Sequence, residues 1–360
     1  MTQLIWRPCY CSRDDVMRAL DVKHAARNGD QIDRQIVQSA EGIDDLCNRQ
    51  FFPEDKTCYF DYPNYSAAYP WRLWLNADEL AVSPATLFKT GAITIPSTAY
   101  FCEPVNEGPP FTYIELDRSQ SYSFGNSSTP QHDIALTGTY GYWYKTQSAA
   151  AQLTAALTDT TGTTVSVSNG AYTGIGDLLV VDSERMLIQD KQAADTTIAF
   201  SGLATASAAD NEVAVPDTTQ FTVGEVLRAD SERLLIVDVL SSTLMIVKRA
   251  WDGTALAAHT SGTLWALRKL SVVRGATGST AATHANSTAV SKCVVPGLVR
   301  ALSVADSVVG LTQEPSAYSA GSPGGRTGGQ QQEPSPGDGL SYLCSRVSTA
   351  YGRNARLRVV

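Results

Sequence analysis

The sequence has few charged residues and no paired set of disulfide or metal ligands. Only 18% of its 360 residues are Asp, Glu, Lys or Arg, below the roughly 25% that is usual in soluble domains. A surface with few charged residues is suited to forming an interface with another molecule. The seven cysteines are an odd, scattered set in which only Cys9 and Cys11 stand close together, which argues against a disulfide framework. The histidines are single, whereas structural zinc needs repeated paired ligands. We expect no metal and no cofactor.

Long apolar runs and a phosphate loop are also missing. No run approaches the roughly 20 residues that span a bilayer, and residues 1–8 do not resemble a signal peptide, so we expect a cytoplasmic product with no membrane partner. No Gly-rich loop is followed by Lys and Ser or Thr, which argues against a nucleotide-driven motor. The net charge of −8 argues against a face that grips nucleic acid, although DNA can slide past an acidic wall.

Two helices are predicted near the start of the chain. Ser12 offers a capping hydroxyl and Asp15 a carboxylate three residues later, which is typical of a helix N-terminus. Asp30 can cap a second, longer helix with one apolar face and one polar face. The apolar positions of this second helix are Ile32, Ile36, Ala40, Ile43 and Cys47.

Helical spacing returns after Cys293. Pro296 stands where a first helical turn tolerates proline. The face predicted to pack consists of Leu298, Leu302, Ala305 and Val309. Residues 315–337, rich in Gly, Pro, Ser and Gln, are predicted as an extended loop or a disordered segment. Asp338 can cap a last helix that leads into a basic tail. The apolar residues in register on this helix are Leu340, Leu343, Cys344, Val347 and Tyr351.

Short β-type segments lie between the early and late helices. Pro, Gly, Asn and Asp separate them, which predicts a small sheet with helices packed against it. The segments are 58–62, 72–75, 92–95, 99–102, 113–116 and 134–144. The aromatic run 140–144 could stack bases or sugars. Because no basic groove accompanies it, packing under helices is the favoured interpretation.

A β-rich module with an internal repeat begins near Ala149. The motif Asp-Ser-Glu-Arg occurs at 182–185 and at 230–233, each time between apolar stretches, which predicts a β-hairpin around a polar turn. A second element runs from Arg to His at 249–259 and at 274–284. The two elements do not recur at one period. The simplest account is nesting, in which a copy over 213–265 is inserted between the halves of a copy that begins near 164 and ends near 290.

The repeated polar motif invites a catalytic interpretation. Ser183 or Ser231 would be the nucleophile and His259 or His284 the base. Duplication argues against this, because catalysis needs one well-oriented site. We expect instead that the Asp caps backbone amides, the Glu pairs with Arg and the histidines bind loop carbonyls. No catalytic residue is therefore assigned.

Three further stretches carry a resemblance. They are residues 32–48 leading into Arg49-Gln50-Phe51-Phe52-Pro53, then Tyr59-Phe60-Asp61-Tyr62-Pro63, and then Leu136-Thr137-Gly138-Thr139-Tyr140-Gly141-Tyr142. With the early and closing helices they resemble the head-to-tail adaptor, or head-tail connector, family of long-tailed bacteriophages. The resemblance covers residues 1–145 and, more loosely, the closing helices, mainly at the level of fold. The repeat resembles segments of phage structural proteins, but Ala250 stands where their pattern has Gly.

The resemblance implies a structural virion protein that is made in the host cytoplasm and is no enzyme. Copies would form a dodecameric ring in the neck between head and tail. The implied partners are other copies, the portal protein above and the stopper or tail completion protein below, with DNA passing through the lumen without sequence-specific binding. The C-terminal helix and tail would dock on an acidic portal surface. The implied docking residues are Leu340, Leu343, Val347, Tyr351, Arg353, Arg356 and Arg358. A solvated tail is the alternative.

Together these patterns predict an α+β protein. The expected domains are an adaptor core of helices and a small sheet (1–148), an all-β insertion built on the nested repeat (149–292), and C-terminal helices and a tail that complete the core (293–360). The alternative function is a phage structural protein whose β-insertion binds a carbohydrate or a capsid surface. Its aromatic platform would be Trp251, Trp265 and Tyr172.

Overall fold

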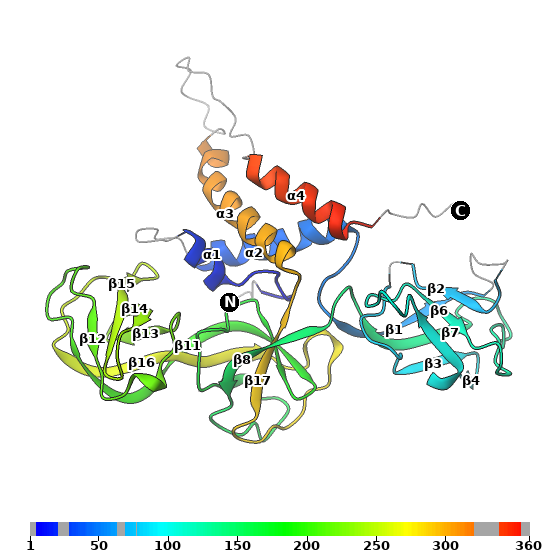
Figure 1. Cartoon of the computed structure of the whole chain (residues 1–360), viewed down its shortest axis with the longest axis horizontal. Helices are drawn as coiled ribbons and strands as arrows, with labels where there is room; N and C mark the ends of the chain where they lie inside the picture. Colours follow the sequence, from blue (N-terminus) through cyan, green and yellow to red (C-terminus); the bar gives the residue numbers. More distant parts are fainter. Residues whose placement is uncertain (1–4, 21–28, 63–68, 77, 320–337, 354–360) are drawn as a thin grey trace, which may run out of the picture. The chain divides into compact units, whose positions relative to one another are not determined.

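The computed structural model describes residues 5–20, 29–62, 69–76, 78–319 and 338–353 (Figure 1). Helices and β-sheets both contribute substantially, which confirms the α+β fold class. The helices are α1 (Arg13–Leu20), α2 (Gly29–Cys47), α3 (Gly297–Ser319) and α4 (Asp338–Tyr351). Within the described residues, no helix is both long and apolar enough to cross a membrane.

The chain forms two compact units whose limits differ from those of the three expected domains. One unit contains Met1–Gly42, Thr146–Ala276 and Thr280–Ser345. The other contains Ile43–Lys145, Thr277–Ser279 and Arg346–Val360. The first helices therefore group largely with the β-rich middle of the chain. That residues 149–292 are an insertion into an adaptor core stays a prediction.

Ten strands form the β-structure of the first unit. They are β8 (Lys145–Gln152), β9 (Thr164–Ser166), β10 (Leu178–Val181), β11 (Glu184–Gly202), β12 (Glu212–Ala214), β13 (Val226–Ala229), β14 (Glu232–Val239), β15 (Leu244–Trp251), β16 (Ser261–Val273) and β17 (Ala289–Val294). The long strands β11 and β16 pair with each other, with register shifts along the way.

Hydrogen bonding closes these strands into two small barrels that share β11 and β16. In the outer barrel the order is β8, β17, β10, β11, β16 and β9, and a bridge between Leu153 and Val167 returns from the end of β8 to β9. In the inner barrel the order is β11, β12, β15, β14, β13 and β16, and β16 pairs again with β11. The inner barrel lies in sequence between the two halves of the outer barrel. Both are visible below α1 and α3 in Figure 1.

The strand pairings confirm the nested repeat. Each barrel has a hairpin with an Asp-Ser turn, between β10 and β11 and between β13 and β14. The turn residues Asp182 and Asp230 have φ of 52° and 51°, the left-handed conformation that Asp tolerates at such turns. In the outer barrel, β10 also pairs with β17, and β9 pairs with β16. In the inner barrel, the equivalent pairs are β13 with β16 and β12 with β15. One supersecondary unit therefore occurs twice.

Alternating side chains fill the inner barrel. Leu234 and Ile236 of β14 and Met245 and Val247 of β15 are buried, while the residues between them are more exposed. This period of two directs every second residue into the barrel. Burial of each large aliphatic side chain contributes about 1.5–3 kcal/mol, so the barrel interior is a main source of stability in this unit.

Helix α1 is fixed to the barrels by a buried lysine. Its predicted N-cap is confirmed, since the Asp15 N–H donates to the Ser12 hydroxyl and the Ser12 N–H donates to the Asp15 carboxylate. Lys191 of β11 donates to the Asp14 carboxylate at 3.0 Å and to the carbonyl oxygens of Gly170 and Thr173. Because three acceptors surround this ammonium group, its burial is compensated.

Helix α2 packs as predicted, but helix α3 does not. The apolar stripe of α2 is buried along its whole length. The buried residues of α3 are Val299, Leu302, Ser303, Ser307 and Leu311. Of the predicted α3 face, only Leu302 is buried. The Ser39 hydroxyl of α2 lies 3.2 Å from that of Ser303, so small hydroxyl residues bring these helices close. The α3 prediction was wrong because apolar residues surround most of this helix and periodicity could not select a face.

Helix α3 also extends past the point where a loop was predicted to begin. It ends at Ser319, four residues beyond Pro315. Proline removes one helical N–H donor, but its fixed φ is compatible with the helical conformation, so it weakens a helix without always ending it. The remainder of the predicted loop, 320–337, lies outside the described residues.

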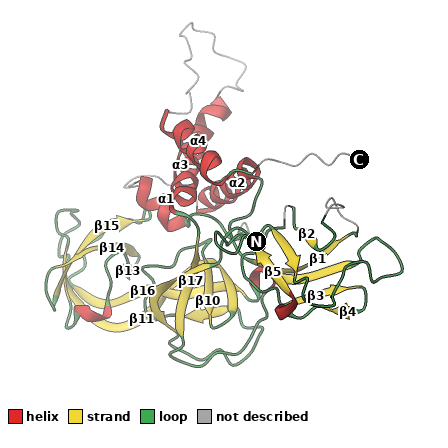
Figure 2. Ribbon diagram, turned by 45° about the vertical axis from the view of Figure 1, so that its right-hand side comes forward, coloured by secondary structure: helices red, strands yellow, loops and turns green. Residues whose placement is uncertain are grey.

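The second unit contains two sheets and not the single sheet expected (Figure 2). One has the order β1 (Glu54–Phe60), β7 (Ile134–Tyr140), β3 (Leu87–Thr90) and β4 (Ile93–Thr94). The other has the order β2 (Arg72–Trp74), β6 (Tyr113–Leu116) and β5 (Tyr100–Glu103). Their common core includes Leu73, Ile114, Phe88 and Leu136 and, among the described residues, none from α1 to α4. The expected helix cover is therefore wrong, because the apolar faces of the two sheets cover each other.

Candidate functional site

A buried glutamate follows the Asp-Ser turn of the outer barrel. The Glu184 side chain is 0% exposed, and Arg274 donates to its two oxygens at 2.7 and 2.8 Å. The backbone N–H groups of Gly275 and Ala282 donate to the same carboxylate at 3.0 and 2.9 Å. His284 completes the set, with Nε2 at 2.8 Å. The carboxylate thus ties the hairpin to the segment that runs from β16 to β17.

The inner barrel repeats this arrangement with different residues. Arg249 donates to Glu232 at 2.8 and 2.7 Å, and both side chains are 0% exposed. The N–H groups of Ala250 and Ala257 donate at 2.9 and 3.1 Å, and His259 Nε2 lies at 2.9 Å. Each Glu does pair with an Arg, but the prediction that this happens within the Asp-Ser-Glu-Arg turn is wrong, because the partners Arg249 and Arg274 come from the second repeated element.

Each histidine bridges two carboxylates. Nδ1 of His284 lies 2.7 Å from Asp182, and Nδ1 of His259 lies 2.9 Å from Asp230, while Nε2 of each contacts the buried glutamate. The predictions that the histidines bind carbonyls and that the aspartates cap amides are wrong, because the second element folds back over the turn. Since both ring nitrogens contact carboxylates, neither histidine is placed to accept a serine proton.

The donors around each glutamate stabilise its charged form. Burial by itself would raise the pKa of Glu184, but hydrogen bonds from Arg274, Ala282 and His284 outweigh it and lower the pKa to about 2. Burial opposes ionisation of Glu232 in the same way, and Arg249 with the N–H groups of Ala250 and Ala257 lowers that pKa to about 2. We conclude that these networks are structural clamps held by charge.

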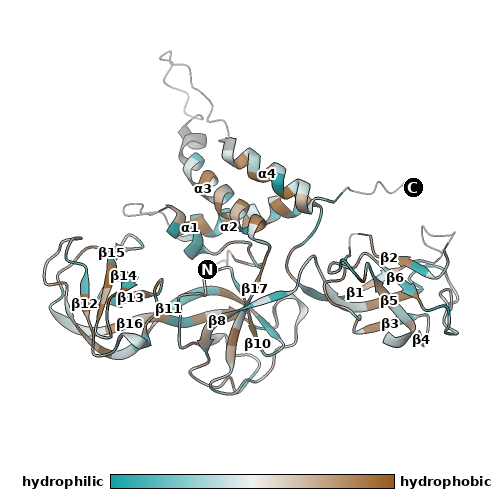
Figure 3. Cartoon of the chain, viewed as in Figure 1, coloured by the Kyte–Doolittle hydropathy of each residue, from teal (hydrophilic) through white to brown (hydrophobic). Residues whose placement is uncertain are grey.

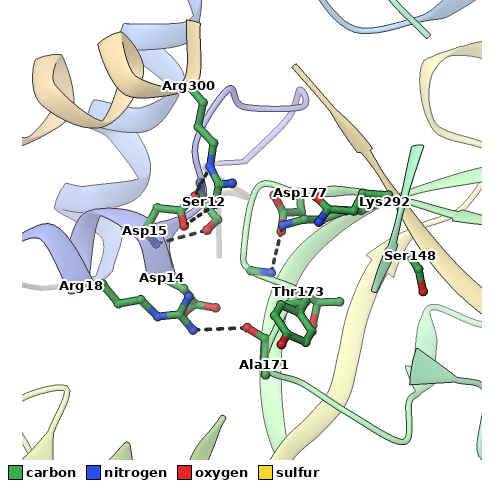
Figure 4. Close-up of a pocket in the computed structure, with 13 residues that line it drawn as sticks. Ser12, Asp14, Asp15, Arg18, Ser148, Ala171, Thr173, Asp177, Lys292 and Arg300 are labelled. Atoms are coloured by element: carbon green, nitrogen blue, oxygen red, sulfur yellow. Dashed lines mark hydrogen bonds and ion pairs between the residues drawn. The ribbon is translucent and has the colours of Figure 1, made fainter. Parts of the chain in front are cut away.

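A small polar pocket of ≈ 110 Å³ is lined by residues of α1, of the first turn of α3 and of the outer barrel (Figure 4). Its charged groups all have partners. Arg300 donates to Asp15 at 2.7 Å, and Lys292 donates to Asp177 at 3.0 Å. Arg18 donates to the carbonyl oxygen of Ala171. These pairings leave little for a charged ligand, and no cluster of metal-ligating side chains occurs in the part of the chain that the structure describes.

The residues implied for portal docking divide between the two units. Val347 is fully buried, and Arg353 contacts Glu79 at 3.3 Å. Tyr351 packs edge-on against Phe51 and Tyr142, which places it in an aromatic cluster of its own unit. Leu340 and Leu343 are half-buried. Arg356 and Arg358 lie outside the described residues. Val347 and Arg353 are thus largely committed to contacts within the chain.

The aromatic residues considered for stacking are mostly occupied. Trp251 is 5% exposed within a buried cluster, so it offers no open platform for a sugar. The Arg228 guanidinium lies 4.8 Å from the centre of the Trp265 ring, and Tyr172 is exposed. In the 140–144 run, Tyr140 is buried among strands and not under helices.

An open apolar groove along α3 was missed by the sequence reasoning. It is lined by Ala19, Gly297, Arg300, Ala301, Val304, Ala305 and Val308 and has a volume of ≈ 560 Å³. Apolar positions (brown) recur along this helix in Figure 3. The signal in the sequence was a helix with apolar residues on all sides, which is typical of a helix buried on more than one face.

Comparisons with protein-family models, curated proteins and solved structures find no match to this chain.

The residue that follows the arginine of each glutamate network has a positive φ, but it is alanine in one network and glycine in the other. Exchanging these residue types should therefore change the free energy of unfolding in opposite directions. Ala250 and Gly275 follow Arg249 and Arg274 and have φ of 53° and 60°. A left-handed conformation costs a residue with a side chain about 1 kcal/mol relative to glycine. Ala250→Gly should raise the free energy of unfolding by up to about 1 kcal/mol, and Gly275→Ala should lower it similarly, measured by chemical denaturation. The same sign for both substitutions would contradict this.

Removal of either network carboxylate should destabilise the protein. Glu184→Gln and Glu232→Gln each leave a buried arginine without its counter-charge, so each should lower the free energy of unfolding by about 3–5 kcal/mol. Glu212→Gln, at an exposed position of β12, is the matched control and should change it by less than about 0.5 kcal/mol.

The same carboxylates predict acid sensitivity. Their pKa values of about 2 in the folded chain lie below the ordinary 4.5, so their stabilisation is complete above pH 4.5 and is lost as the pH falls through 2. Each should contribute about 3 kcal/mol. In the Gln variants the decline in stability between about pH 5 and pH 2 should be shallower. Equal acid slopes in wild type and variants would rule out this role.

Proposed function

We propose that the chain is a structural virion protein of a tailed phage, a head-to-tail adaptor. Its copies form a ring between the portal and the stopper or tail completion protein, and DNA leaves through the lumen. The residues that carry the resemblance to this family lie in α2, in and beside β1 and β7 of the four-stranded sheet, and in the closing helices. In this proposal Leu340 and Leu343 of α4 contact the portal.

The open groove of α3 is the observation that carries this proposal. Ala301, Val304, Ala305 and Val308 present small and branched apolar side chains, although α3 is already packed on its other face. Exposed apolar surface of this kind marks sites of protein association. Small side chains also allow a second helix to approach closely. An assembling protein needs such a surface.

The internal use of polar groups supports a structural role. The glutamates, arginines and histidines that could serve catalysis form two equivalent clamps with both ring nitrogens of each histidine engaged. A duplicated clamp stiffens two barrels alike, which suits a protein that must hold its shape under the passage of DNA. The alternative function, in which the β-rich region binds a carbohydrate, has less support. Trp251 cannot stack on a sugar ring, because its own ring is buried.

The proposal predicts a ring that depends on α3. Purified full-length protein should form rings, alone or on portal rings, in negative-stain microscopy and mass photometry. Val304→Asp should abolish assembly because it places a charge in the apolar groove, whereas Thr312→Asp, at an exposed position of α3, should assemble normally. A wild-type chain that stays monomeric and never engages a portal would refute the adaptor proposal.

A further inference from the structure

The solvent side of the three-stranded sheet carries aromatic residues where polar ones are usual. In an antiparallel sheet with one buried face, the outward positions normally hold polar side chains. Here Leu73, Ile114 and Cys102 point into the core, and their neighbours Trp74, Tyr113 and Phe101 point outward. Trp74 pairs across the strands with Tyr113, and their rings are 4.7 Å apart.

Two arginines extend this surface. The Arg72 guanidinium lies 5.0 Å from the ring centre of Tyr69 and 4.8 Å from that of Tyr113. Arg118 lies 4.4 Å from the ring centre of Trp71. We call this surface the aromatic face. It consists of Tyr69, Trp71, Arg72, Trp74, Phe101, Tyr113 and Arg118, with Glu103 and Glu115 between them. Tyr69 is 48% exposed and Phe101 is 51% exposed.

We propose that the aromatic face binds a neighbouring copy of this chain. The inference rests on the proposed function, because it assigns a second contact surface to the same ring. In a closed ring built from one kind of subunit, each copy needs two different surfaces. One surface binds the copy on one side, and the other binds the copy on the opposite side. The groove of α3 is one, and the aromatic face is the second.

The balance of charge on the aromatic face allows another copy of this acidic chain to bind there. The chain carries a net charge of −8, so two copies repel unless they meet where charge is locally balanced. On the aromatic face the two arginines are matched by Glu103 and Glu115, and Arg72 pairs with Glu115 at 3.1 Å. The same carboxylates disfavour a nucleic-acid strand, which needs a positively charged groove.

The rings favour a protein over a sugar. Guanidinium groups already lie over Tyr69, Tyr113 and Trp71, which restricts the stacking of a sugar ring on them. Trp, Tyr and Arg held in fixed positions are instead the residues that dominate protein interfaces. Two of these rings, Tyr69 and Phe101, are about half exposed and the other three are partly covered, so the face supplies the aromatic part of a contact and not a whole standard interface of roughly 800 Å² per partner.

The strand that carries Phe101 also lies at a sheet edge. Within the described residues, β5 is the last strand of its sheet and pairs only with β6. Edge strands are normally kept short and protected by charge or by proline, and β5 is short and ends at Glu103 before Pro104. The exposed Phe101 is the apolar residue on this edge that a partner would cover.

Charge introduced on this face tests the proposal. Phe101→Glu and Arg118→Glu should each weaken self-association of the full-length chain at least about tenfold, measured by sedimentation velocity, because each leaves a charge without a counter-charge in a buried contact. Tyr59→Glu is the matched control, since Tyr59 is an aromatic residue 60% exposed on β1 of the other sheet, and it should assemble as wild type. Circular dichroism and thermal melts confirm that each variant folds.

A photoreactive phenylalanine analogue at position 101 provides a second measurement that does not depend on a destabilising substitution. Irradiated assemblies should give a covalent dimer of the chain. Crosslinking only to portal, or retention of added glycan or single-stranded DNA without a dimer, would overturn the proposal. Rings that survive Phe101→Glu and Arg118→Glu but not Val304→Asp would overturn it too and leave the adaptor proposal standing. A wild-type chain that never assembles would remove both.

Discussion

The ion pair between a buried glutamate and a distant arginine holds each barrel together. Glu184 and Arg274 lie 90 residues apart in the chain, and Glu232 and Arg249 lie 17 apart, yet the two pairs have almost the same geometry. A buried charge pair of this kind gains little over a well-packed apolar pair, but the removal of one partner alone leaves a buried charge and is expensive. It therefore helps to specify which segment closes each barrel, since the arginine, two backbone N–H groups and a histidine all come from that one segment.

The shared strands make the two barrels parts of one body. Strands β11 and β16 run through both, so the inner barrel continues the hydrogen bonding of the outer one. In the outer barrel, β11 and the second half of β16 pair as β14 and β15 pair in the inner barrel. The inner barrel therefore stands where the outer barrel would otherwise have the tip of a hairpin.

The open apolar surfaces and the clamps use different chemistry in this protein. The clamps bury charge and satisfy it with hydrogen bonds, which gives a fixed shape. The groove of α3 and the aromatic face leave apolar surface open, which gives a gain in free energy only when another molecule covers it. A chain with little charge and much internal pairing of that charge is suited to assembly, and we infer that its function resides in those two surfaces.

The amino-acid sequence by itself determined the local features. The α2 stripe, the capping box of α1, the Asp-Ser turns and the nesting of the repeat all follow from spacing and order, because they involve neighbouring residues or a repeated pattern. Tertiary structure alone decided the rest. Which side of α3 is buried depends on Ser39 and its neighbours, and which arginine meets Glu184 depends on a chain reversal. The division of the alternating strands into two sheets depends on their partners. Periodicity states that a face is apolar, but only packing decides what covers it.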